Sequence, residues 1–302
     1  MTYLIFVAGL VALTLGGEFL VRGASGIARH FRLSPMVIGL TIVGFGTSAP
    51  ELLVSVQAAL AGQPGIAIGN VLGSNIANTL LILGISAVIA PLLIPLSKIW
   101  RDLGFMLVAT ALVWIMLLDG WIGRGNGLIL LLGLGVFLAT AFLSGKADAA
   151  DDPAPMIAQP MAWAMTVGGL IVMVIGARLL VDSASEIARS FGISEAVIGL
   201  TVVAVGTSLP ELATSVIAAL RKQTEIAVGN IVGSNIFNIF GILGTTAVIS
   251  PIPADPRFAH VDMFWVAGSA IALTAMAVVW GGLPRKAGVA LLLAYAAFMA
   301  LI

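Results

Sequence analysis

The chain has 302 residues, of which 60% are hydrophobic and only 9% are charged, and its formal net charge is zero. Soluble domains carry roughly 25% charged residues, so the composition excludes a soluble globular protein, and the charge balance gives no sign of a nucleic-acid partner. The absence of cysteine excludes disulfides and thiolate metal sites.

Apolar runs of about 17–25 residues predict transmembrane helices. The first run has no basic segment before it, so we expect a membrane helix and not a cleaved signal peptide. Ten spans are predicted, and with them an all-α membrane protein. They are Tyr3–Leu20, Pro35–Ala61, Ile66–Ala90, Leu103–Leu118, Asn126–Leu143, Met161–Val181, Ala196–Leu220, Ile226–Ser250, Met263–Trp280 and Ala287–Ile302.

One acidic, proline-containing stretch, residues 146–160, divides the spans into two groups of five. We therefore expect a first five-helix repeat at 1–145, a linker at 146–160 and a second five-helix repeat at 161–302. Leu40–Gly84 aligns without gaps onto Leu200–Gly244, with 27 of 45 positions identical. Because five is odd, the second half enters the membrane from the opposite side, which is an inverted-topology repeat typical of secondary transporters.

Lysine and arginine predict the orientation. Ten of them fall in the connections after the odd-numbered spans and four on the other side of the membrane. The positive-inside rule then places both termini outside the cytoplasm and the linker inside it. We expect a multi-pass protein of the plasma (inner) membrane.

The same ionisable phrase occurs in span 2 and in span 7. Residues 46–51 read GTSAPE, and residues 206–211 read GTSLPE. The residues Thr47, Ser48 and Glu51 share one helix face, and their matches are Thr207, Ser208 and Glu211. Proline and glycine in the same turn predict broken helices 2 and 7. Broken backbone at membrane depth is tolerated only where protein or a cavity surrounds it.

Spans 3 and 8 repeat a polar stripe. Asn70, Ser74 and Asn78 are four residues apart, and Asn230, Ser234 and Asn238 match them. A direct ligand role is the favoured interpretation for four of these residues, namely Ser74, Asn78, Ser234 and Asn238. For Asn70, Asn75, Asn230 and Asn235, ligation and simple interhelical hydrogen bonding are equally compatible with the pattern.

All of these groups are hard oxygen ligands, which suit Ca²⁺, Mg²⁺ and Na⁺. Mg²⁺ gives up its water reluctantly, so a dry cage of helix breaks favours Ca²⁺ and Na⁺. Two bare carboxylates about 5 Å apart would repel by about 3 kcal/mol at an effective dielectric near 20. One Ca²⁺ or two Na⁺ would neutralise Glu51 and Glu211, and a third Na⁺ would leave one positive charge.

The phrases GTSAPE with GNVLGSNIAN, and GTSLPE with GNIVGSNIFN, resemble the two alpha-repeats of the sodium/calcium exchangers. The resemblance covers essentially the whole chain and is closest to a short prokaryotic member of the cation/calcium exchanger superfamily. It implies Na⁺/Ca²⁺ antiport by alternating access, with three Na⁺ expected per Ca²⁺, with helices 1 and 6 sliding over a static core, and without a prosthetic group or an obligatory protein partner.

The resemblance also implies the ligands. Glu51 and Glu211 match the principal carboxylates, and Thr47, Ser48, Thr207 and Ser208 match the hydroxyl and carbonyl ligands beside them. Ser74 and Ser234 match further ligands, Gly44 and Ala204 occupy backbone-carbonyl positions, and Asn78 matches the central amide. Asn238 is an amide where some relatives, including potassium-dependent exchangers, carry Asp. This difference argues against potassium dependence and leaves the stoichiometry open.

The same residues could serve other functions. H⁺/Ca²⁺ exchange through Glu51 and Glu211 is the alternative, although proton-coupled relatives tend to carry a different glutamate phrase. Exchange of another divalent cation is a further possibility. An intramembrane enzyme using Ser48 or Ser208 is disfavoured because no histidine falls within a predicted span. A passive channel is the remaining class, and we do not expect an enzyme.

Overall fold

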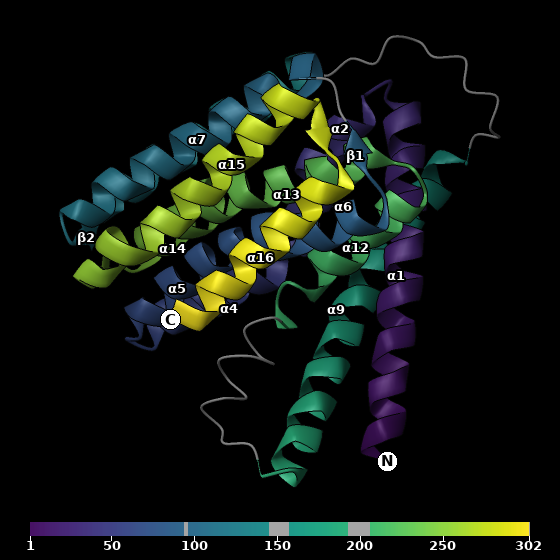
Figure 1. Ribbon diagram of the computed structural model, residues 1–302, viewed down its shortest axis with the longest axis horizontal. Coiled ribbons are helices and arrows are strands. Elements are labelled where there is room, and N and C mark those ends of the chain that lie inside the picture. The colour runs from purple at the N-terminus through teal and green to yellow at the C-terminus, as the bar shows by residue number, and fades with distance from the viewer. Residues whose placement is uncertain (94–95, 145–156, 193–205, 302) are drawn as a thin grey trace.

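The computed structural model describes residues 1–93, 96–144, 157–192 and 206–301, and its regular structure is almost entirely helical (Figure 1). The α-helices are α1 (Thr2–His30), α2 (Pro35–Ile38), α3 (Gly44–Thr47), α4 (Ala49–Leu60), α5 (Pro64–Ile76), α6 (Leu83–Ile89), α7 (Leu96–Leu118), α8 (Arg124–Ser144), α9 (Gln159–Ser190), α12 (Leu209–Leu220), α13 (Thr224–Phe237), α14 (Gly244–Ile249), α15 (Met263–Trp280) and α16 (Arg285–Leu301). The all-α prediction is confirmed.

Seven of the described helical segments are long and apolar enough to cross a membrane, or eight if one bent pair counts as a span. The bent pair is Pro35–Thr47 and Ala49–Leu60, which meet at 45° around Ser48. The chain is therefore a multi-pass membrane protein. Ten spans are not shown, because the predicted seventh falls partly outside the described residues and α16, with 17 residues, is short.

Several predicted boundaries were wrong. Helix α1 continues to His30, well beyond the expected end at Leu20, because the apolar pattern resumes after Glu18 and Arg22. Helix α9 begins at Gln159, inside the predicted linker, with a proline in its first turn. Proline is well tolerated there because the first amide groups of a helix have no intrahelical acceptor.

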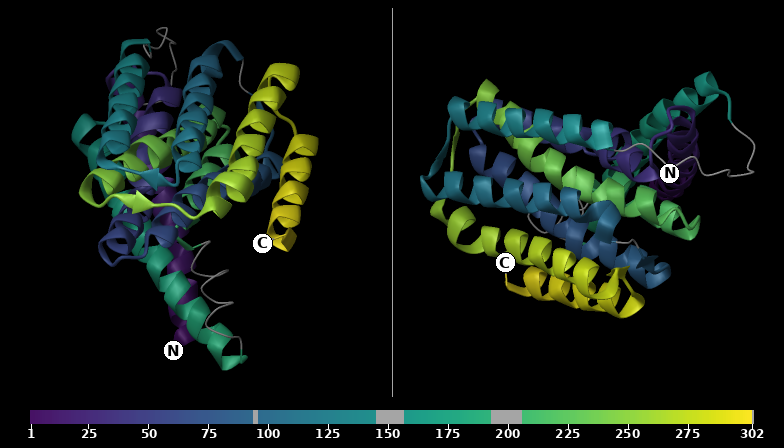
Figure 2. Two further views of the ribbon diagram at one scale, coloured as in Figure 1. Left: turned by 90° about the vertical axis from the view of Figure 1, so that its left-hand side faces the viewer. Right: turned by 90° about the horizontal axis from the view of Figure 1, so that it is seen from above.

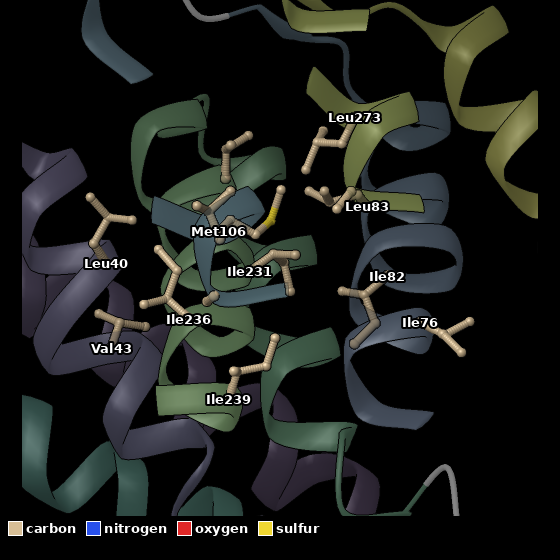
Figure 3. Packing of buried hydrophobic residues seen from close by; sticks show 14 of the residues in the cluster. Leu40, Val43, Ile76, Ile82, Leu83, Met106, Ile231, Ile236, Ile239 and Leu273 are labelled. Carbon is tan, nitrogen blue, oxygen red and sulfur yellow. The ribbon is translucent and has the colours of Figure 1, made fainter. Parts of the chain in front are cut away.

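The two repeated polar helices lie at the centre of the molecule. In the most apolar part of the segment Thr224–Ile249, 94% of the residues are buried. In the most apolar part of Pro64–Ile89, 67% of the residues are buried. The corresponding values for α1 and α9 are 33% and 28%. Figure 3 shows Leu40 and Val43 beside Ile236, within the apolar core that surrounds the central helices.

Wide π-helical turns interrupt these central helices. They are η1 (Gly39–Val43), η2 (Ala77–Ile82) and η4 (Asn238–Leu243), with a fourth, η5 (Phe258–Asp262), before α15. A π-turn inserts one residue into the helix and is frequent at functional sites. Because η2 and η4 contain Asn78 and Asn238, the helical register changes at both of these amides.

Two short β-bridges connect the ends of the helices. Strand β1 (Leu92–Leu93) pairs with β4 (Gly282–Leu283), and β2 (Trp121–Ile122) pairs with β3 (Ile252–Pro253), both antiparallel. Positions 92 and 252, and positions 122 and 282, are each 160 residues apart. The two bridges are thus one contact made twice, once from each half of the chain.

Helices α1 and α9 pack along each other and extend away from the other helices (Figures 1 and 2). Glycines permit this close approach. A Cβ atom at Gly9 would lie 2.9 Å from the carbonyl oxygen of Gly176, and one at Gly16 would lie 2.8 Å from that of Gly169. Small residues at such a crossing let two membrane helices pack at close range.

Candidate cation site

The two buried glutamates occupy equivalent positions in the first turns of α4 and α12. Glu51 is 1% exposed and Glu211 is 0% exposed. Each follows a serine at the N-cap and a proline in the first turn. A serine at the N-cap with glutamate three residues later is a capping-box sequence, in which the two side chains normally satisfy the amides of their own helix.

Neither serine caps its own helix here. Instead, Ser48 Oγ donates a hydrogen bond of 3.0 Å to Glu211 Oε1, and Ser208 Oγ donates one of 3.2 Å to Glu51 Oε1. Each half of the chain therefore holds the carboxylate of the other half.

Two asparagines support the glutamate turns from within the same half. Asn70 Nδ2 donates to the backbone oxygen of Glu51 at 3.0 Å and to Ser55 Oγ at 2.9 Å. Asn230 Nδ2 does the same with the backbone oxygen of Glu211 and with Ser215 Oγ, at 3.3 and 3.0 Å. Both amide nitrogens are thus used to hold the backbone behind each carboxylate.

The amides of Asn78 and Asn238 are bound across the two halves. Asn78 Nδ2 donates to Asn235 Oδ1 at 3.1 Å, and Asn238 Nδ2 donates to Asn75 Oδ1 at 2.9 Å. All four side chains are buried. Their donor groups point at a neighbouring amide, so the oxygens of Asn78 and Asn238 are left for another partner.

Four buried acceptors on the glutamates and asparagines of these networks have no hydrogen-bond partner among the described residues. They are Glu51 Oε2, Glu211 Oε2, Asn78 Oδ1 and Asn238 Oδ1. A buried acceptor without a partner costs about 1–3 kcal/mol, and more when it is charged. Carboxylate and amide oxygens of this kind are the ligands that Ca²⁺ and Na⁺ prefer.

Hydroxyl and carbonyl groups extend this oxygen set. Thr47 Oγ1 lies 3.3 Å from the carbonyl oxygen of Gly44 and 3.1 Å from Asn230 Oδ1. Ser234 Oγ donates to the same Gly44 oxygen at 3.2 Å. The close packing of η1 against α13 requires glycine at position 233, where a Cβ atom would lie 2.2 Å from the carbonyl oxygen of Leu40.

Among the predicted ligands, hydrogen bonds across the two halves link Ser48 to Glu211, Ser208 to Glu51, Thr47 to Asn230 and Ser234 to Gly44. Ser74 is buried on α5, four residues before Asn78, and Thr207 is half-buried next to Ser208. Ala204 lies outside the described residues. Among the described residues, no group of three or more His, Asp or Glu side chains is arranged to hold a metal.

Two further repeated pairs of polar residues were not predicted from the sequence. Unpartnered buried oxygens also occur on Ser86, Thr246, Asp102 and Asp262. Positions 86 and 246, and positions 102 and 262, are again 160 residues apart, so the same offset could have revealed them beyond Leu40–Gly84. The aspartates differ from the glutamates in having arginine neighbours: Arg101 Nη2 lies 2.7 Å from Asp102, and Arg257 Nε lies 3.7 Å from Asp262.

Known proteins resemble this chain over most of its length. The family model described as sodium/calcium exchanger protein matches residues 1–143 and 161–302. The sodium/calcium exchanger MaX1 of Methanosarcina acetivorans is 32% identical, over 98% of this chain and 97% of its own, and the inner membrane protein YrbG of Escherichia coli is 38% identical, over 83% and 81%. A structure of the sodium-calcium exchanger NCX_Mj, soaked with 2.5 mM Na⁺ and 10 mM Sr²⁺, matches all of both chains with a TM-score of 0.89 and 34% identity.

Proposed function

Because the chain belongs to the sodium/calcium exchanger family, whose members are cation/Ca²⁺ antiporters, we propose that it exchanges Na⁺ for Ca²⁺ across a membrane through the site between Glu51 and Glu211. One observation carries the proposal: each half of the chain contributes one carboxylate oxygen and one amide oxygen that are buried without a partner among the described residues. No prosthetic group takes part, and Ca²⁺ and Na⁺ are the transported substrates.

The proposed architecture is ten transmembrane helices in two inverted five-helix repeats, at 1–145 and 161–302, joined by the linker 146–160. The duplicated β-bridges and the α1–α9 crossing support it, because each consists of two contacts that the 160-residue offset relates to each other. Both termini would then lie outside the cytoplasm. Since one chain supplies both halves of the site, we expect transport without an obligatory partner.

The proposed ligands fall into three groups. Glu51 and Glu211 supply the charge, and Asn78 and Asn238 supply amide oxygens between them. The supporting hydroxyl and carbonyl ligands are Thr47, Ser48, Thr207, Ser208, Ser74, Ser234, Gly44 and Ala204. Ser48 and Ser208 have a second role, because each donates to the glutamate of the other repeat.

The charge of the site determines the exchange ratio that we propose. With both glutamates ionised and both amides neutral, the ligands carry two negative charges. One Ca²⁺ or two Na⁺ would balance them, and three Na⁺ would leave one positive charge. Exchange of three Na⁺ for one Ca²⁺ by alternating access would therefore move one net charge per cycle.

Uptake into vesicles tests the proposal. Purified chain in liposomes with an imposed Na⁺ gradient and a clamped pH should accumulate ⁴⁵Ca²⁺, and collapsing the Na⁺ gradient should stop accumulation. Uptake that ignores Na⁺ but follows an imposed pH gradient would replace Na⁺ by H⁺ as the coupling ion. A membrane-potential dye reads the charge moved, and a voltage-independent rate would contradict the three-to-one ratio.

A further inference from the structure

Two buried asparagines beside the site have not been given a role. Asn75 and Asn235 are each 2% exposed, and each directly follows one of the proposed serine ligands, Ser74 or Ser234. Their side chains are directed across the repeat boundary toward Asn238 and Asn78. These two contacts join residues 163 and 157 positions apart in sequence.

An amide ligand has a right and a wrong orientation. Its oxygen can bind a cation, whereas its NH₂ group is a donor that a cation repels. At Asn238 the NH₂ group donates to Asn75 Oδ1, and at Asn78 it donates to Asn235 Oδ1. Holding the NH₂ group in this way leaves each Oδ1 atom as the unpartnered acceptor of the site.

The orientation of Asn75 is itself fixed by the backbone. Asn75 Nδ2 donates to the carbonyl oxygen of Asn235 at 3.1 Å. A backbone carbonyl only accepts, so a reversed Asn75 amide would lose this bond and would also face Asn238 with a donor. Asn235 Nδ2 donates in turn to Thr79 Oγ1 at 2.8 Å. The hydrogen-bonding directions are therefore determined from the backbone through Asn75 to Asn238.

We propose that Asn75 and Asn235 are positioning residues, each of which orients the amide ligand of the opposite repeat so that its oxygen faces the cation. The proposal rests on the proposed cation site. It explains why the asparagine of the GSN phrase occurs in both halves: each asparagine acts on the amide ligand of the other repeat.

A double-mutant cycle tests this orientation directly. Asn75→Ala frees the Asn238 amide to rotate, and we expect the Ca²⁺ affinity to fall by about tenfold. A carboxylate at position 238 has two equivalent oxygens and no wrong orientation. In the Asn238→Asp background, Asn75→Ala should therefore cost less than about threefold. The measurement is equilibrium ⁴⁵Ca²⁺ binding to the purified full chain.

The repeat supplies matched controls. In the Asn78→Asp background, Asn75→Ala should keep its full cost of about tenfold, whereas Asn235→Ala should lose most of its cost. Equal costs of Asn75→Ala in all three backgrounds would overturn the proposal, because a purely structural role does not depend on which ligand is a carboxylate. If Asn75→Ala is not recovered folded, Asn75→Ser enters the same cycle with the same expectation.

Failure of this inference is distinguishable from failure of the proposed function. Wild-type protein and Glu51→Gln are measured in the same binding assay. If wild type binds Ca²⁺ and Glu51→Gln does not, the site stands, and the cycle decides the role of the asparagines alone. If Glu51→Gln binds Ca²⁺ as well as wild type, the site itself is wrong and the positioning role is rejected with it.

Discussion

Two pairs of carboxylates recur at the same spacing in this chain, and their surroundings differ. Glu51 and Glu211 bond to serines of the opposite half, whereas Asp102 and Asp262 lie beside arginines from their own half. The salt bridges among the described residues include both aspartates and neither glutamate. Duplication is common to both pairs, and what distinguishes the glutamates is that no arginine or lysine forms an ion pair with them among the described residues.

The arginines make the same distinction in sequence. Arg101 immediately precedes Asp102, whereas Arg257 lies five residues before Asp262, and neither arginine has a basic match 160 residues away. The arginine beside each aspartate thus comes from a different sequence position in each half. The glutamate turns keep their serine, proline and threonine neighbours in both halves, as a shared site requires.

The largest expected effect comes from removing one glutamate charge. Glu51→Gln or Glu211→Gln should lower Na⁺-driven ⁴⁵Ca²⁺ uptake by about a hundredfold or more, because each removes half of the charge that binds Ca²⁺. The isosteric change keeps the hydrogen-bond acceptor for Ser208 or Ser48, so the protein should insert normally. Uptake at the wild-type rate by either variant would contradict the distinction drawn between the glutamate pair and the aspartate pair.

The serine exchange should give a smaller and symmetric effect. Ser48→Ala and Ser208→Ala each remove a hydrogen bond to a buried carboxylate. The Ca²⁺ affinity should therefore fall by about tenfold in both variants. The matched control is Ser269→Ala, a buried serine whose hydroxyl donates to the backbone oxygen of Val266, away from both carboxylates. A strong effect from one serine and none from the other would contradict the reciprocal arrangement.

Acid should weaken Ca²⁺ binding by several-fold between pH 8 and pH 5, since protons and Ca²⁺ compete for the same carboxylates. The sign follows from charge: each proton bound to Glu51 or Glu211 removes one negative charge. Because the amide ligands do not titrate, at most two protons, one from each glutamate, are displaced per bound Ca²⁺. The logarithm of the Ca²⁺ affinity should therefore change by no more than two per pH unit. A titration calorimeter measures this slope, and a flat profile would contradict proton competition.

The smallest effect on ion binding is expected at the second carboxylate pair. Asp102→Asn should change Ca²⁺ affinity by less than about twofold, because that charge is already balanced by Arg101. It should instead lower the free energy of unfolding in detergent by about 1–3 kcal/mol, because it weakens the charge pair between Asp102 and Arg101. A loss of Ca²⁺ binding as large as that of Glu51→Gln would remove the distinction between the two pairs.

Part of this arrangement could be predicted from the sequence. The all-α membrane fold, the family and the equivalence of Glu51 with Glu211 follow from an ungapped repeat. The contacts do not, because Ser48 and Glu211 are 163 residues apart and the S-x-x-E spacing also fits ordinary helix capping. The π-turns at Asn78 and Asn238 were not predicted, since a single inserted residue leaves no signal in hydrophobic periodicity.

The central claim is that the two halves build one shared Ca²⁺ site. Equilibrium ⁴⁵Ca²⁺ binding to a known amount of purified chain tests it most directly. The account predicts one Ca²⁺ per chain at saturation, displaced by Na⁺ and lost entirely in Glu51→Gln and in Glu211→Gln alike. Two Ca²⁺ per chain, with one retained in each single variant, would mean that each repeat binds its own ion and would contradict the account.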